Sequence, residues 1–127
     1  MASPSDLPAG FDPVETVRAY HAAIDAIDFD AVERFFADAA VYRSAGTGGV
    51  VEGKAAILAA FRRYFSEFPD QRAEDSLFER TGPNTVRSLW SLKATSEETG
   101  TISERSGEQI VTFDAAGKIV LVEVYDH

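Results

Sequence analysis

The side chains best suited to acid–base chemistry in this sequence are a neighbouring tyrosine and histidine. The chain has 2 histidines and no cysteine, so imidazole comes only from His21 and His127, and thiol nucleophiles and thiolate zinc sites are excluded. Tyr20 and His21 recur at helical spacing with Val17 and Ile24, which places them on one face of an amphipathic helix. From that face Tyr20 would donate a hydrogen bond into a pocket, and His21 would exchange a proton.

A carboxylate near the end of the chain offers a second proton-transferring group. Asp126 alternates with Val122 and Val124, so the three side chains share one face of an expected strand. If that face lines a pocket, apolar surroundings favour the protonated carboxyl and suit Asp126 to general acid or base chemistry. The competing interpretations are a surface aspartate at the chain end, a structural role for His21 and a buried, backbone-bonded Tyr20.

Strand alternation predicts further side chains that line the pocket. Trp90 lies in an alternating segment, and Tyr42 and Arg105 have the parity needed to approach the same face. The acidic residues around the first helix break fit no calcium-binding loop, and we interpret them as helix caps and solvated surface. These acidic residues are Asp25, Asp28, Asp30 and Glu33. No arrangement of ligands predicts a metal site, and we expect no cofactor.

The elements that position these residues form a helical first part and a strand-rich second part. Apolar residues recur with helical spacing up to Pro69, which ends the third helix, and they alternate after it. The predicted helices run from the Asp12 cap to the break at 28–30, from 29 to 39, and from about 54 to 68. The predicted strands cover 41–44, 73–80, 85–95, 102–113 and 118–125, with a glycine-rich loop at 45–49.

Helices followed by consecutive strands with short turns predict an α+β fold, with three N-terminal helices packed on one face of a mainly antiparallel sheet. At 127 residues we expect one domain, 12–127, after a flexible tail at 1–11. The tail lacks the features of a signal peptide, which predicts a cytoplasmic protein. The last strand is apolar on both faces, so we expect a homodimer that covers the face with Leu121 and Tyr125.

The charge of the chain restricts its partners. Lys and Arg total 12, Asp and Glu total 21, and the formal net charge is −9. This charge repels nucleic-acid phosphates and anionic lipid. No segment reaches the roughly 20 apolar residues that a membrane helix needs. We therefore expect neither nucleic acid nor a membrane as a partner.

Four segments share their order and spacing with a known family. They are VRAY at 17–20, DFDAVERFFAD at 28–38, GKAAI at 53–57 and FDAAGKI at 113–119. Together they resemble the SnoaL-like and ketosteroid-isomerase-like proteins of the nuclear transport factor 2-like superfamily, over about residues 13–126. The resemblance implies a cone-shaped fold, in which a strongly bent sheet and the helices enclose a mostly apolar cavity. It also implies homodimers built on the outer sheet face.

The resemblance assigns site positions as well. In the isomerase pattern Tyr20 matches the tyrosine donor, Ser44 falls on the general base and Gln109 falls on the protonated acid. Serine without an activating partner does not act as a base near neutral pH, and Gln109 donates only as a neutral amide. In the epoxide-hydrolase pattern Val124 stands where an aspartate is needed. The steroid-isomerase and epoxide-hydrolase reactions are therefore not expected.

Three functions remain open at this point. The first is an enzyme of isomerase, cyclase or dehydratase type that acts on a hydrophobic small molecule, with Tyr20 as donor and Asp126 or His21 as acid or base. The second is a protein that only binds such a ligand, and the third is a protein-interaction module that uses the exposed sheet face. The ligand-binding residues expected for the first two are Tyr42, Ser44, Trp90, Gln109, Val122 and Val124.

Overall fold

Three helices form one layer of the protein in a computed structural model that describes residues 7–44 and 49–127. They are α1 (Pro13–Asp25), α2 (Phe29–Phe35) and α3 (Lys54–Glu67). The Asp12 carboxylate caps α1 by accepting hydrogen bonds from the backbone N–H groups of Val14 and Glu15, at 3.0 and 3.3 Å. The Asp28 carboxylate caps α2 by accepting from the N–H of Ala31 at 3.1 Å. Both helices therefore begin where the sequence supplies a capping side chain.

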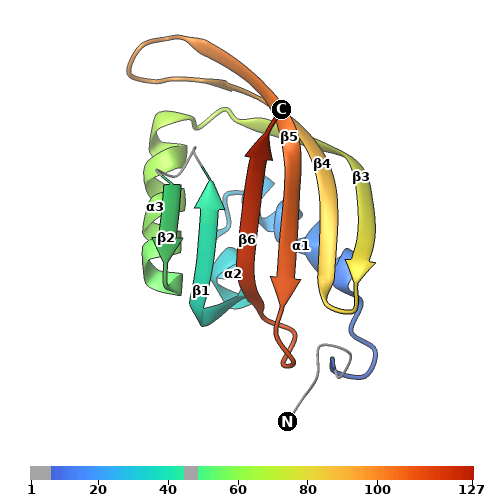
Figure 1. Ribbon diagram of the computed structural model, residues 1–127. Coiled ribbons are helices and arrows are strands. Elements are labelled where there is room, and N and C mark those ends of the chain that lie inside the picture. Colours follow the sequence, from blue (N-terminus) through green and yellow to red (C-terminus); the bar gives the residue numbers. More distant parts are fainter. Residues whose placement is uncertain (1–6, 45–48) are drawn as a thin grey trace.

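Within the same residues, a six-stranded sheet forms the second layer, with α1 and α2 behind it in Figure 1. Its strands are β1 (Phe36–Ser44), β2 (Gly49–Glu52), β3 (Arg72–Gly82), β4 (Thr85–Thr95), β5 (Ile102–Phe113) and β6 (Ile119–Asp126). They lie in the order β2-β1-β6-β5-β4-β3, and only the β1–β6 pair is parallel among them. The predicted α+β fold with a mainly antiparallel sheet is confirmed.

The two strands at one side of the sheet differ from the sequence prediction. β1 begins at Phe36, inside the segment predicted to be the second helix, because Phe36 pairs with Ile119 of the distant β6. β2 was not predicted: only its first residue, Gly49, fell in the predicted loop, and four residues are too few to show an alternating pattern. It pairs with β1, and Tyr42 stands opposite Val51. Residues 45–48 of the predicted loop lie outside the described residues.

The core lies between the helices and the inner face of the sheet. Val17 and Tyr20 of α1, Ile57 of α3 and Val111 of β5 are at most 1% exposed. Side chains from both layers share this one cluster, so burial of the α1 and α3 apolar faces fixes how these helices sit on the sheet.

Part of the predicted flexible tail is packed. The Phe11 ring lies edge-on to Phe113, with 5.2 Å between ring centroids, and Leu7 packs against the same core. Residues 7 and 11 of the predicted tail therefore contact the domain, while residues 1–6 lie outside the described residues. No helix within 7–44 and 49–127 has the length and apolar character needed to cross a membrane.

The last strand changes face near its start. The pairing of β6 with β5 shifts register just after Ile119, so that Ile119 and Val122 are both fully buried. Ile119 and Leu121, two positions apart, therefore do not share a face as strict alternation would require. A register shift of this kind adds one residue to a strand and reverses its alternation. Tyr125 is 45% exposed.

Candidate functional site

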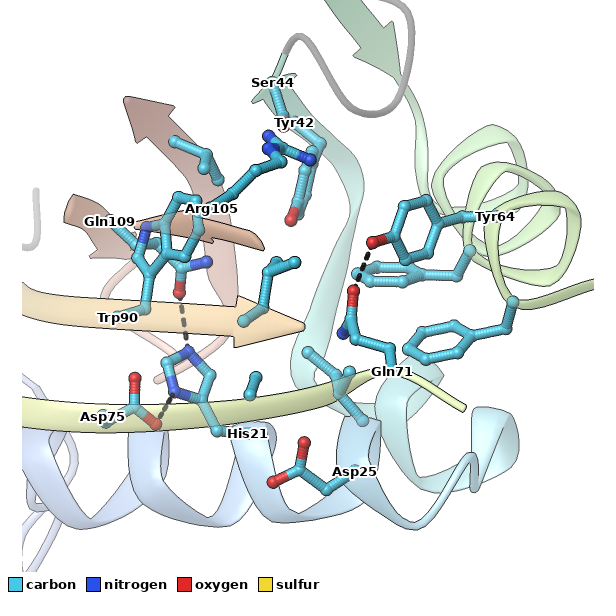
Figure 2. A pocket seen from close by; sticks show the side chains of 16 residues that line it. His21, Asp25, Tyr42, Ser44, Tyr64, Gln71, Asp75, Trp90, Arg105 and Gln109 are labelled. Atoms are coloured by element: carbon cyan, nitrogen blue, oxygen red, sulfur yellow. Dashed lines mark hydrogen bonds and ion pairs between the residues drawn. The ribbon is translucent and has the colours of Figure 1, made fainter. Parts of the chain in front are cut away.

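The helices and the inner sheet face enclose a cavity of about 120 Å³ (Figure 2). Side chains from α1, α3 and the strands β1, β3, β4, β5 and β6 line it. Most of its wall is apolar, with Ile24, Phe61, Phe65, Ala73, Leu92 and Val124 among the lining residues. Polar side chains gather at two places in this wall, one around His21 and one around Arg105 (Figure 2).

His21 is held at both ring nitrogens. Its Nδ1 lies 2.9 Å from Asp75 Oδ2, and its Nε2 lies 2.7 Å from Gln109 Oε1. The His21 and Asp75 side chains are 14% and 18% exposed. Oxygen atoms accept hydrogen bonds, so an oxygen on each side of the ring matches an imidazolium that donates from both nitrogens. The site thus places an imidazole between two oxygen atoms beside an apolar wall.

Asp25 brings a second proton-transferring group to the same helix face. It follows His21 by four residues on α1, so the two side chains are neighbours on the helix surface, and both line the cavity. Asp25 lies at an exposed rim, and within the described residues its carboxylate accepts no hydrogen bond. Partial burial raises the pKa of the Asp25 carboxyl; the nearby Asp75 adds to this rise, while His21 and Arg72 oppose it. Asp25 is therefore a stronger base than an ordinary aspartate.

The second polar group is built around an arginine. Arg105 Nε and Nη2 donate to the two carboxylate oxygens of Asp126 at 2.7 and 2.8 Å. The guanidinium carbon lies 5.7 Å from the centroid of the Trp90 ring. A Cβ at Gly107 would come within 2.8 Å of that ring and 2.0 Å of the Tyr125 carbonyl oxygen. Any larger residue at position 107 would therefore collide with Trp90, and glycine allows the Trp90 ring to lie beneath Arg105.

Two tyrosines contribute hydroxyl groups to the cavity. Burial raises the pKa of Tyr42, and Tyr64 adds to this rise while Arg105 opposes it. Burial likewise raises the pKa of Tyr64. Both therefore stay protonated near neutral pH. The Tyr64 hydroxyl donates to Gln71 Oε1, and the Tyr42 hydroxyl points toward the interior of the cavity (Figure 2).

Most of the residues predicted to bind a ligand do line the cavity. They are Tyr42, Ser44, Trp90, Gln109 and Val124. His21, predicted as an acid or base, and Arg105 line it as well. Val122 does not line it: it shares the inner sheet face with Val124, but its fully buried side chain packs in the core. Asp126 does not line it either: its carboxylate is bound to Arg105, so it orients the arginine instead of facing the cavity. His127, at the chain end, lies outside it as well.

Tyr20 does not occupy its predicted place. It is fully buried, and it packs between His21, Phe35 and Phe36 with ring centroids 5.4–5.8 Å away. It is absent from the cavity wall, and its hydroxyl makes no hydrogen bond within residues 7–44 and 49–127. The expectation that Tyr20 presents its hydroxyl to the cavity is therefore wrong. The helix face was predicted correctly, but the aromatic residues of 35–36 cover Tyr20.

We expect Tyr20→Phe to leave ligand binding and turnover unchanged. Loss of a buried hydroxyl without a partner removes a desolvation cost, so the free energy of unfolding should stay within about 1 kcal/mol of the parent or rise. Chemical denaturation followed by circular dichroism measures this change. A fall in turnover of about a hundredfold, typical of a lost oxyanion donor, would restore Tyr20 as a catalytic residue.

Four polar residues of the cavity were not predicted. Asp25 was interpreted as a cap or surface residue, although its spacing of four from His21 signals a shared helix face. Asp75 lies in the predicted strand 73–80, for which no inner face was predicted. Tyr64 lies within the predicted third helix, and Gln71 lies between that helix and the next predicted strand. No group of three His, Asp or Glu side chains in the described part of the chain is arranged to hold a metal ion.

Comparison with known proteins finds one family and many similar structures. The sequence pattern of the SnoaL-like domain matches residues 17–122. An NTF2-like protein from Burkholderia thailandensis is 26% identical over 92% of this chain and 92% of its own, with a TM-score of 0.82. A Mycobacterium tuberculosis protein, solved in complex with estradiol-17β-hemisuccinate, is 18% identical over 91% of this chain and 94% of its own, with a TM-score of 0.78.

A third similar structure is an enzyme. SalBIII, described as an epoxide hydrolase/cyclase-like enzyme in pyran ring formation in the polyether salinomycin, is 20% identical. The alignment covers 91% of this chain and 90% of that enzyme, with a TM-score of 0.78. No curated protein sequence matches the chain. At these identities the structural comparisons describe the fold.

Proposed function

The chain belongs to the SnoaL-like domain family and has the NTF2-like fold, and on this premise we propose that its cavity binds a hydrophobic carbonyl compound and transfers a proton at the carbon next to the carbonyl. The observation that carries the proposal is the placement of His21 and Asp25 side by side in one apolar-walled cavity (Figure 2). A donor and a carboxylate base on one surface are the groups that proton abstraction beside a carbonyl requires.

In the proposed reaction Asp25 is the base. Its carboxylate takes the proton from the carbon, and the electron pair of the broken C–H bond moves to the carbonyl oxygen to give an enolate. His21 Nε2–H donates to that oxygen as its negative charge develops, in a setting where the apolar wall strengthens the interaction. Asp25 then returns its proton to another carbon in an isomerisation, or to a departing hydroxyl in a dehydration.

Asp75 and Gln109 act through His21 in this scheme. Asp75 accepts from Nδ1 at 2.9 Å, which holds the ring in one orientation and balances its charge. Gln109 accepts from Nε2 at 2.7 Å and occupies the position that the ligand oxygen takes. Its amide turns aside when the ligand binds, and its N–H₂ group then becomes a second donor to the same oxygen.

The structural neighbours support an apolar, oxygen-bearing ligand. One of them holds a steroid ester, and another is an enzyme of pyran ring formation. Both descriptions fit a cavity with an apolar wall and few polar groups. The chemistry proposed here uses side chains alone, without a cofactor.

Ligand binding without catalysis is the second candidate function. It is favoured by the contacts of His21, since both ring nitrogens already have protein partners. In that case the His21–Gln109 bond stays intact, and the cavity sequesters its ligand without chemistry.

Proton exchange on 2-tetralone, a two-ring ketone with acidic protons beside its carbonyl, separates the two functions. In deuterated buffer we expect the protein to accelerate loss of these proton signals in a saturable way. The Asp30→Asn variant is the matched control, because Asp30 is exposed and lies outside the cavity. Binding of 2-tetralone without faster exchange would establish the sequestering function. Absence of both would contradict each candidate.

The outer sheet face carries the prediction of a homodimer. Half-buried Leu121 and exposed Tyr125 lie on this face, and the charged pair of Arg87 and Glu108 lies there at 2.6 Å. We expect the chain of 13.8 kDa to sediment as a dimer at micromolar concentration, because burial of this face removes apolar surface from water. Leu121→Arg should sediment as a monomer. A parent protein that stays monomeric would contradict the prediction.

A further inference from the structure

The Arg105 end of the cavity has features that the proposed proton transfer does not use. Arg105, Tyr42 and Ser44 lie together on the side of the cavity opposite Asp75 and Asp25 (Figure 2). Arg105 is the only lysine or arginine among the described residues that line the cavity. The cavity therefore has an acidic end and a cationic end, with apolar wall between them.

The arginine is held in place and remains charged. Its hydrogen bonds to Asp126 raise the pKa of the Arg105 guanidinium, while burial opposes this. Asp126 engages two of the five N–H donors of the group, which leaves further donors in the same plane. Trp90 lies 5.7 Å beneath the guanidinium, and the side chain is 28% exposed. An arginine fixed in this way binds an anion without first losing much conformational freedom.

From this arrangement we propose that the Arg105 end is a binding subsite for a carboxylate, so that the ligand is a hydrophobic acid with its reacting end at His21 and Asp25. The guanidinium matches a planar carboxylate, and charge-assisted hydrogen bonds are the stronger ones. The Tyr42 hydroxyl is a second donor on the same side of the cavity (Figure 2). A phosphate fits less well, because a single cation already shared with Asp126 does not balance two negative charges. This inference rests on the proposed function, since it orients the ligand of the same cavity.

A matched pair of probes tests the subsite. 1-Adamantanecarboxylate and 1-adamantanecarboxamide have the same compact apolar body and differ in charge. Neither absorbs where tryptophan does, and the chain has one tryptophan, Trp90, which lines the cavity. Titration of Trp90 fluorescence therefore gives the dissociation constant of each probe. We expect the carboxylate to bind at least about tenfold more tightly than the amide.

Two arginine variants decide what causes that preference. Arg105→Gln should abolish it while the affinity for the amide stays within about threefold of the parent, which also shows that the variant is folded. Arg63→Gln removes the same charge from an exposed position on α3, and it should keep the full preference. Equal affinities in the parent, or a preference that survives Arg105→Gln, would overturn the carboxylate subsite. If the amide binds in those cases, the proposal that the cavity binds a hydrophobic carbonyl compound stands. If neither probe binds, that proposal fails as well.

Discussion

Replacing His21 with phenylalanine is expected to slow proton exchange of 2-tetralone by about 10²–10⁴-fold, the usual contribution of a general acid. Phenylalanine keeps a planar ring in the cavity wall and removes both ring nitrogens. The enolate oxygen then loses its N–H donor in an apolar site, where such a donor has its largest effect. The measurement is the rate of loss of the proton signal beside the carbonyl, followed by nuclear magnetic resonance.

A second variant separates catalysis from folding. His21→Phe leaves the Asp75 carboxylate, 18% exposed, without its partner, which costs stability. His21→Gln retains a hydrogen-bond donor toward Asp75 but transfers no proton near neutral pH. It should therefore fold like the parent, as circular dichroism will show, and remain slow in exchange. Parental exchange rates in a folded His21→Gln variant would exclude His21 as the acid.

Asp25→Asn is expected to produce a loss of about the same size, 10²–10⁴-fold, because an amide accepts no proton from carbon. Asparagine keeps the shape of the side chain at an exposed rim, so the stability should change by less than about 0.5 kcal/mol. The control is Asp30→Asn, which removes the same charge from an exposed position outside the cavity. Equal rates in Asp25→Asn and Asp30→Asn would contradict the assignment.

The pH profile of the same reaction carries the signature of Asp25. Burial raises the pKa of this carboxyl above its ordinary value of 3.8, and only the ionised form is a base. The rate should therefore rise with pH, with a midpoint above 3.8. A rate that stays constant across the acid range would show that no carboxylate acts as the base.

The helical part of the fold was largely predictable from the sequence. Asp12 and Asp28 supply caps for α1 and α2, and both make the expected hydrogen bonds. The change from helical spacing to alternation after Pro69 marks the start of the sheet, and β4 and β5 have the predicted bounds. These features depend on neighbours within a few residues, which is why the local pattern records them.

The cavity residues were predicted unevenly. His21, Tyr42, Trp90 and Val124 line the cavity as expected, because alternation and helical spacing fix the face on which a side chain lies. Gln109 also lines it, as the family resemblance implied. The function given to His21 depends on Asp75, which is 54 positions away along the chain. No spacing rule joins residues so far apart, and Asp75 was therefore not a candidate.

The sequence by itself determined the class of fold, the helix caps, the face of most side chains and the absence of thiol chemistry, because each follows from residue type and near neighbours. Only the tertiary structure decided which of the side chains on these faces line the same cavity. Two aromatic residues cover Tyr20, the core encloses Val122, and an ion pair with Arg105 engages Asp126. The same packing brings Asp75 and Gln109 to His21 from two strands. Packing joins segments distant in sequence, and it selects among the orientations that local pattern allows.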